Sequence, residues 1–278
     1  MKQILDLEKG PLVAVWETTQ SCDPDYCLAT GQPERDPLEL TSSEAEKMIR
    51  DVAELRPPMF ALAGGRPLDR EDIYSLVCYA ASCHLHPILV MNASRKLTRA
   101  VVWKLKHAGL SRLGLVLDGA GPEIHDLVNG DGSFARTRQT MRWATEVRLP
   151  LQIHTNISRH SHADLENIAA LLSADRVLLW SVSFPVGAEN ADSRELLSAK
   201  ETEEIFARLY RLAQMVPFKI KTVEAPHYRR YVLQQRAKLN KEQVSRPAEA
   251  SMEEGIPGVM PVHEGRGSLF ITQCSSPL

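Results

Sequence analysis

Short apolar runs alternate with longer helical patterns along most of this chain, and this alternation limits the folds that the chain can adopt. The helical patterns span 45–55, 98–108, 134–147, 164–172 and 201–216, and one more ends at 82 and begins after a cap at Asp69 or Asp72. The apolar runs are mostly continuous, which is typical of parallel strands buried on both faces. They span 12–19, 59–63, 87–91, 113–117, 151–155, 177–184 and 218–223. Strand–helix–strand units in this order predict right-handed crossovers around one parallel sheet.

Two architectures fit this order: an open doubly wound sheet, and a full or partial (β/α) barrel. A dinucleotide-binding open sheet carries GxGxxG after its first strand, and no such motif is present there. Polar residues follow most of the strands, which is where a barrel places its active site. They are Glu17, Thr18, Gly64, Gly65, Arg66, Asn92, Asp118, Gly119, His154, Asn156, Ser181 and Glu224. The pattern favours an α/β protein of the barrel type.

The composition of the chain excludes several classes of protein. Its 278 residues carry 33 Lys and Arg against 35 Asp and Glu. This balance lacks the excess of basic residues that is typical of nucleic-acid-binding proteins. No apolar run reaches the roughly 18 residues of a membrane span. The first ten residues carry four charges, unlike a secretory signal, and five cysteines are too few for a disulfide framework. We expect a soluble, cytoplasmic protein that uses neither nucleic acid nor a membrane as its partner.

The character of the sequence changes after residue 226, and we divide it into a barrel at 1–226, a basic helix at 227–246 and a tail at 247–278. The helix carries six Lys or Arg against one Glu, which suits a solvated face or a surface for an anion or a partner. Eight of the 32 tail residues are Pro or Gly. We therefore expect an irregular tail, to which 267–272 could add one edge strand.

Cys22 and Cys27 lie in the loop that leaves the first strand, at the mouth of the expected barrel. Thiolates placed there could ligate a soft metal or an iron–sulfur cluster, although two are fewer than the four ligands such a site uses. The alternative is a pair of partly buried free thiols. Cys78 and Cys83 precede the third strand, at the opposite end of the barrel, and we interpret them as core cysteines.

Glycines mark two loops of interest. Gly64 and Gly65 directly follow the second strand, where paired glycines let backbone amides approach a ligand closely. The alternative is a simple turn between a strand and a helix. In the loop at 130–134, Ser133 is the expected cap of the helix that follows.

His154 and Asn156 alternate onto the same side of the fifth strand, so both could point into the barrel. His154 could act as a general base there, oriented by the carboxylate of Asp118 or Glu224.

Several of these segments, in this order, resemble the radical SAM superfamily, in particular its peptide- and haem-pathway type with a SPASM extension. The resemblance runs from about residue 12 to residue 235. It is carried by WETT at 16–19 leading to Cys22-Asp23, GGxPL at 64–68 with REDI at 70–73, LDG at 117–119, His125-Asp126, GSFxxT at 132–137, and residues 155–159. It implies a partial (β/α)6 barrel that binds S-adenosylmethionine at its C-terminal mouth. The implied cofactor-binding residues are Gly64, Gly65, Arg66, Asn92, Asp118, His154, Asn156 and Arg159.

The chain departs from the family's pattern around the cofactor. The family holds a [4Fe–4S] cluster with three cysteines spaced CxxxCxxC, whereas here Cys22 matches the first, Cys27 matches the third, and no middle cysteine is present. Arg66 stands where the family's GGEP turn uses a glutamate to hold the ammonium of S-adenosylmethionine. Asn129 stands where an arginine commonly faces the cofactor's carboxylate. We interpret the tail at 247–278 as the remnant of a missing SPASM domain.

These departures lead to a first hypothesis, a radical-SAM-like barrel that serves as a non-catalytic binding or accessory module. Its partner would be an active paralogue or a peptide in a modification pathway. The alternative is an active radical SAM enzyme of peptide- or haem-pathway modification, with an atypical cluster site that Asp25 or another protein's cysteine completes. A third hypothesis is a non-radical enzyme that uses His154 for acid–base chemistry.

Overall fold

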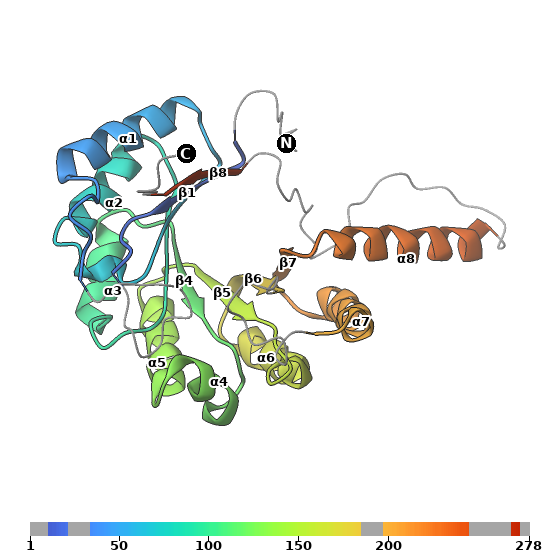
Figure 1. The fold of residues 1–278 in the computed structure, drawn as a ribbon. Helices are drawn as coiled ribbons and strands as arrows, with labels where there is room; N and C mark the ends of the chain where they lie inside the picture. Colours follow the sequence, from blue (N-terminus) through green and yellow to red (C-terminus); the bar gives the residue numbers. More distant parts are fainter. Residues whose placement is uncertain (1–10, 22–33, 185–196, 245–267, 273–278) are drawn as a thin grey trace.

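The structure, a computed structural model, describes residues 11–21, 34–184, 197–244 and 268–272 (Figure 1). The strands form one sheet in the order β7-β6-β5-β4-β3-β2-β1-β8, and neighbouring strands run parallel. Each of the seven apolar runs coincides with one strand to within a residue or two at each end, as predicted. The strands are β1 (Val13–Glu17), β2 (Met59–Ala63), β3 (Pro87–Met91), β4 (Arg112–Val116), β5 (Leu151–Asn156), β6 (Val177–Ser183), β7 (Lys219–Val223) and β8 (Ser268–Ile271).

The strand order distinguishes the two expected architectures. From β1 to β7 each strand pairs with the one that precedes it in the chain, whereas a doubly wound sheet reverses its order. Figure 1 shows the sheet curled about an open interior, with the helices outside it. The fold is therefore α/β and a partial barrel, as expected. β8 pairs with the outer edge of β1, so the expected edge strand at 267–272 is present.

Helices cover the outer face of the curled sheet (Figure 1). Two of them begin with a capping box, formed by Thr41 with Glu44 at α1 and by Ser198 with Glu201 at α7. The described helices are α1 (Ser42–Glu54), η1 (Pro67–Asp69), α2 (Ile73–Ser82), α3 (Arg99–His107), α4 (Pro122–Asn129), α5 (Ser133–Glu146), η2 (His162–Asp164), α6 (Leu165–Ala174), α7 (Ala199–Met215) and α8 (Pro226–Val244).

The connection after β4 differs from the expectation in two respects. It holds an additional helix, α4, whose eight residues are too few to display a repeating apolar stripe in the sequence. The prediction that Ser133 caps α5 is wrong: Ser133 is the first residue of α5, and Gly132 precedes it with a φ of 72°. The carboxylate of Asp126 caps the helix instead, accepting from the Gly132 N–H at 2.8 Å, the Phe134 N–H at 2.7 Å and the Ser133 hydroxyl at 2.8 Å.

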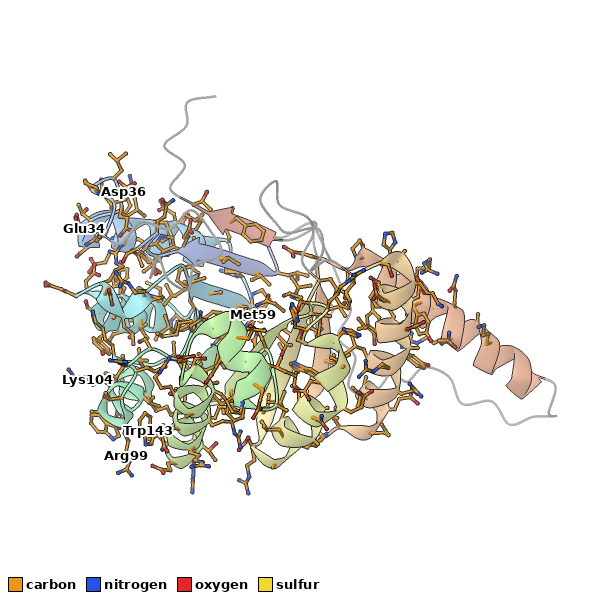
Figure 2. All side chains as sticks on the ribbon, turned by 60° about the horizontal axis from the view of Figure 1, so that its bottom comes forward. Glu34, Asp36, Met59, Arg99, Lys104 and Trp143 are labelled. Carbon is orange, nitrogen blue, oxygen red and sulfur yellow. The ribbon has the colours of Figure 1, made fainter. Side chains whose placement is uncertain are left out.

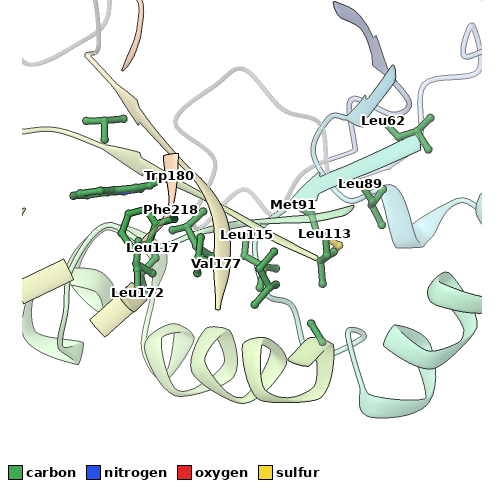
Figure 3. Packing of buried hydrophobic residues seen from close by; sticks show 14 of the residues in the cluster. Leu62, Leu89, Met91, Leu113, Leu115, Leu117, Leu172, Val177, Trp180 and Phe218 are labelled. Atoms are coloured by element: carbon green, nitrogen blue, oxygen red, sulfur yellow. The ribbon is translucent and has the colours of Figure 1, made fainter. Parts of the chain in front are cut away.

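The two faces of the sheet differ, which corrects the expectation of strands buried on both faces. On β1 and β2, buried residues alternate with half-buried ones. The helices cover only one face, and Figure 3 shows apolar side chains packed there, among them Leu62, Leu89, Leu113, Leu115 and Trp180. The other face of β4 to β7 carries polar side chains, including Arg112, Gln152, His154, Ser181 and Lys221. Along β4 to β7 the open interior is therefore lined by polar side chains.

The outer helices carry charged side chains, several of them in ion pairs. Arg99 of α3, labelled in Figure 2, donates from Nε to Glu146 of α5 at 2.9 Å. α8 extends beyond the barrel (Figure 1) and is anchored on α7, where Tyr228 is buried and its ring centroid lies 5.4 Å from that of Phe206. Among the residues that the structure describes, no helix combines the length and apolar character that a membrane span needs.

Candidate functional site

A cavity of about 490 Å³ lies at the carboxyl ends of β2 and β3. The carboxyl ends of parallel strands meet at one edge of a barrel, so the loops that follow them share a rim. The walls come from the turn after β2, the loop between β3 and α3, and the loop between α4 and α5. The lining residues are Gly65, Arg66, Leu68, Asp69, Met91, Asn92, Ala93, Ser94, Arg95, Lys96, Asn129, Asp131 and Arg136.

Gly65, Arg66 and Asn92 are the three expected cofactor-binding residues that line this cavity. Gly64, Asp118, His154, Asn156 and Arg159 do not line it. Five charged lining residues were not predicted from the sequence: Asp69, Arg95, Lys96, Asp131 and Arg136. The sequence does contain a signal for Arg95 and Lys96, because both follow Asn92 in the loop after the third strand. The arginine at 136 lies within a helical pattern, which offered no such signal.

Gly64 joins the turn after β2 to the segment that leaves β1. Its φ is 115°, and a Cβ atom there would lie 2.4 Å from the carbonyl oxygen of Thr19, so the position requires glycine. The Gly65 N–H donates to the same oxygen at 3.0 Å, and Thr18 donates to Ala63 O from both its N–H and its hydroxyl at 2.8 Å. The close approach that glycine allows at position 64 is therefore between two segments of the chain, the turn after β2 and the segment after β1. This contact holds residues 18–21 beside the cavity.

Glu39 is a buried carboxylate that binds both flanks of residues 22–33, the segment that contains the two expected cluster cysteines. It is 4% exposed. Its Oε1 accepts from the Thr19 hydroxyl at 2.7 Å and from the Gln20 N–H at 2.9 Å, and its Oε2 accepts from Arg35 Nε at 2.6 Å. One side chain thus holds the chain on each side of that segment.

Arg70 is a second buried charge at the same place, 1% exposed. It forms an ion pair with Asp72 at 2.8 Å and donates to the carbonyl oxygens of Thr18 at 3.0 Å and Leu40 at 3.1 Å. Its guanidinium carbon lies 5.3 Å from the ring centroid of Trp16, within the range of a cation–π contact. Arg70 therefore joins the end of β1, the start of α1 and the start of α2.

Arg66 lies between the cavity and the residue that precedes Cys22. Its Nη2 donates to Ser21 Oγ at 3.0 Å, and its Nε lies 3.1 Å from Asp69 Oδ2. Asp69 also forms an ion pair with Lys96 at 2.8 Å, so two cations share one carboxylate. The Arg66 side chain is 35% exposed, which leaves part of the guanidinium accessible from the cavity.

Asp118 and Asn156 lie together near the carboxyl ends of β4 and β5. Asp118 is buried and accepts from the Asn156 N–H at 2.7 Å and from Asn129 Nδ2 at 2.9 Å. Burial raises the pKa of Asp118, and these hydrogen bonds oppose that shift. The Asp118 N–H donates to Nδ1 of His125, whose pKa burial lowers to about 4, so that His125 is neutral near pH 7. This network connects β4, β5 and α4, which is a structural role.

His154 lies on the inner face of β5, away from the cavity. Its Nε2 is 2.9 Å from Gln152 Nε2, and Gln152 also accepts from Arg112 and donates to Ser181. Burial lowers the pKa of His154 to about 4, with a further contribution from the charges of Lys221 and Arg112. In the described part of the chain, neither Asp118 nor Glu224 hydrogen-bonds to His154, so the expected base with an orienting carboxylate does not form there.

The remaining expected residues lie elsewhere. Arg159 forms an ion pair with Glu201 of α7 at 3.6 Å, and Cys22 and Cys27 lie outside the described residues. The interpretation of Cys78 as a core cysteine is wrong: it is exposed, because it lies off the buried stripe of α2. Within the described residues, no group of three His, Cys, Asp or Glu is placed to hold a metal ion.

Comparisons with known proteins agree on one family. The family model of the Radical SAM superfamily matches residues 23–172. The AdoMet-dependent heme synthase of Methanosarcina barkeri (strain Fusaro / DSM 804) is 29% identical over 238 residues, which cover 84% of this chain and 68% of that protein. The PqqA peptide cyclase of Rhodopseudomonas palustris is 29% identical over 180 residues, covering 63% of this chain and 48% of that protein. The chain thus spans about half to two thirds of the length of these relatives.

Solved structures share the fold. SuiB of Streptococcus suis, bound to S-adenosylmethionine, superposes with a TM-score of 0.61 at 14% identity, covering 77% of this chain and 51% of that one. SuiB bound to its precursor peptide SuiA superposes with a TM-score of 0.63. At this identity the likeness establishes the fold alone.

Proposed function

The chain belongs to the radical SAM superfamily, and from that premise we propose that its barrel is a non-catalytic binding or accessory module that does not cleave S-adenosylmethionine. The observation that supports this proposal is the position of Arg66, at the cavity wall and hydrogen-bonded to Ser21. S-adenosylmethionine carries positive charge on both its sulfonium and its ammonium. A guanidinium repels both groups and attracts only the single carboxylate of the cofactor, so a cation at this position opposes its binding.

The supply of sulfur ligands supports the same proposal. A [4Fe–4S] cluster is held by thiolates, and the resemblance implies three of them in one loop. The chain carries only Cys22 and Cys27 in that loop. Radical chemistry requires a cluster that passes an electron to the bound sulfonium, and two thiolates do not make such a site.

The test is anaerobic reconstitution of the full chain with iron and sulfide, followed by reduction in the presence of S-adenosylmethionine. We expect no more 5′-deoxyadenosine than the Cys22→Ala variant produces, measured by chromatography with mass spectrometry. Stoichiometric or catalytic release that disappears in Cys22→Ala would overturn the proposal.

A charge reversal tests the role assigned to Arg66. We expect Arg66→Glu to bind S-adenosylmethionine about tenfold more tightly than the parent chain, because a repulsive charge becomes an attractive one. Titration calorimetry measures the affinity. Arg142→Glu is the matched control, since Arg142 is exposed on α5 and does not line the cavity. Equal affinities in all three proteins would contradict the role.

An active radical SAM enzyme of peptide- or haem-pathway modification is the second candidate. It is favoured by the hydrogen bonds of Glu39 and Arg70, which fix the flanks of the segment that contains Cys22 and Cys27. The PqqA peptide cyclase and the SuiA complex of SuiB suggest a peptide as the substrate or partner. The 5′-deoxyadenosine assay separates the two candidates, and repeating it with a candidate active paralogue tests the accessory role.

A further inference from the structure

The described residues that line the cavity carry an excess of positive side chains. Among them are four cations and two carboxylates: Arg66, Arg95, Lys96, Arg136, Asp69 and Asp131. Asp69 is shared, because Arg66 lies 3.1 Å and Lys96 lies 2.8 Å from its oxygens. Arg95 and Arg136 form no ion pair with any residue that the structure describes. Two guanidinium groups therefore face the cavity without a counter-ion among the described side chains.

Arg136 is oriented by backbone groups. It is half-buried in the first turns of α5, where its Nε donates to the carbonyl oxygen of Ala93 at 3.3 Å and its Nη1 donates to that of Asp131 at 3.1 Å. These carbonyls belong to opposite walls, the loop after β3 and the loop between α4 and α5. They fix the guanidinium without neutralising its charge, and its Nη2 makes no hydrogen bond to a described residue. An arginine held in this way is pre-organised to bind an anion.

The rest of the lining suits a small molecule. Leu68 and Met91 supply apolar surface, and Asn92 supplies an amide. A volume of about 490 Å³ falls within the roughly 300–1,000 Å³ typical of small-molecule sites. The cavity therefore has room for more than an isolated ion.

Building on the function proposed above, we propose that the ligand of this cavity is a small molecule with an oxyanion, a carboxylate or a phosphate, bound by Arg136, Arg95 and Arg66. Planar guanidinium groups bind both kinds of oxyanion through paired N–H···O bonds. The binding is reversible and includes no covalent step. The ligand differs from S-adenosylmethionine in net charge: it is an anion, whereas the sulfonium and ammonium of S-adenosylmethionine outweigh its single carboxylate.

Titration calorimetry on the full chain tests this inference, with inorganic pyrophosphate and citrate as probes at constant ionic strength. Pyrophosphate represents the phosphate class and citrate the carboxylate class, so the tighter probe identifies the class. We expect at least one of them to bind at one site, more weakly as salt is added. Failure of both probes to bind at millimolar concentration would overturn the inference.

Variants locate the site. Arg136→Ala and Arg95→Ala should each weaken binding of the tighter probe about tenfold, the loss of one charge-assisted contact. Arg142→Ala removes the same charge from an exposed position on α5 and should leave the affinity unchanged. Arg95 is exposed, so its variant remains informative if Arg136→Ala does not fold. Equal affinities for Arg95→Ala and Arg142→Ala would place the anion elsewhere and overturn the inference.

The two proposals fail in different ways. Release of 5′-deoxyadenosine would refute the non-catalytic function whatever the anions do. Absence of anion binding, with no release of 5′-deoxyadenosine, would refute the ligand class and leave the non-catalytic function standing.

Discussion

Glu39 and Arg70 each place a buried charge between segments that are far apart in the sequence. Glu39 contacts Thr19 and Arg35, while Arg70 contacts Thr18 and Asp72. Burying a charge is costly unless it is paired and hydrogen-bonded, and both of these charges are. Removing either one leaves its partners uncompensated in the interior. These side chains therefore control the geometry of the mouth.

We expect Glu39→Ala to lower the free energy of unfolding by about 2–3 kcal/mol, because the Thr19 hydroxyl and the Gln20 N–H lose a buried acceptor. Urea denaturation measures the change, and amide hydrogen exchange should accelerate at residues 20–21. Glu54→Ala, at an exposed position of α1, is the control and should change stability by less than about 0.5 kcal/mol. Similar losses in both variants would contradict the anchoring role.

Gly64→Ala should cost at least about 2 kcal/mol, since its φ of 115° is strained for alanine and its new Cβ would meet the Thr19 carbonyl at 2.4 Å. Gly121→Ala is the matched comparison. Its Cβ would meet only the end of the flexible Glu123 side chain, at 2.6 Å, which can move away. Thermal unfolding of the two variants checks the ranking, and a reversed order would contradict it.

Part of the site could be predicted from the sequence and part could not. Gly65, Arg66 and Asn92 follow strand ends, so their place at the mouth follows from the barrel pattern alone. Glu39 could not be found in this way, because its partner Thr19 lies 20 positions away and no local pattern marks it. Arg136 sits within a helical pattern, and only the packing of α5 against the loop after β3 brings it to the cavity.

At the scale of elements, α4 and α5 are joined by a side-chain cap. The Asp126 carboxylate of α4 accepts three hydrogen bonds from the first residues of α5 and from Gly132 before it. Because Arg136 lies in α5, this cap also sets the position of one wall of the cavity.

We expect Asp126→Ala to destabilise the protein by about 1–2 kcal/mol, the usual cost of losing a helix cap. It should also weaken binding of the tighter anion probe, because α5 would carry Arg136 less firmly. Urea denaturation and titration calorimetry measure the two effects. Asp51→Ala, at an exposed position of α1, is the control. Unchanged stability in Asp126→Ala would rule out the capping role.

The strands were predictable because continuous apolar runs mark them, and every run overlaps a strand. The burial of those strands was less predictable. A continuous run does not reveal whether helices cover one face or both, and here Val15, between the buried Ala14 and Trp16, is only half-buried. α4 was missed because a helix of eight residues has two turns and no repeating stripe.

At the scale of the whole molecule, two buried histidines link stability to pH. Burial lowers the pKa of His125 and of His154 to about 4, below the ordinary value near 6.5. The unfolded state protonates these imidazoles below about pH 6.5, whereas the folded state protonates them only near pH 4. The free energy of unfolding is therefore highest above about pH 6.5 and falls as the pH falls towards 4. The raised pKa of Asp118 acts in the opposite sense, favouring the folded state as that carboxyl is protonated.

We expect the free energy of unfolding to fall by about 1–2 kcal/mol per buried histidine between pH 7 and pH 5. Urea denaturation at a series of pH values measures it. His154→Gln should reduce the loss by about half, whereas His107→Gln, at an exposed position, should leave it unchanged. A flat profile for the parent chain over this range would contradict the assignment.

The pairing of β8 with β1 has a consequence for biosynthesis. β1 is made before β2 to β7, and its second neighbour, β8, is made only when the ribosome reaches residues 268–271. Until then the backbone groups along its outer edge have no partner strand, and such an edge can recruit strands from other molecules. A nascent chain that stalls after β7 therefore exposes an adhesive border that β8 would otherwise cover.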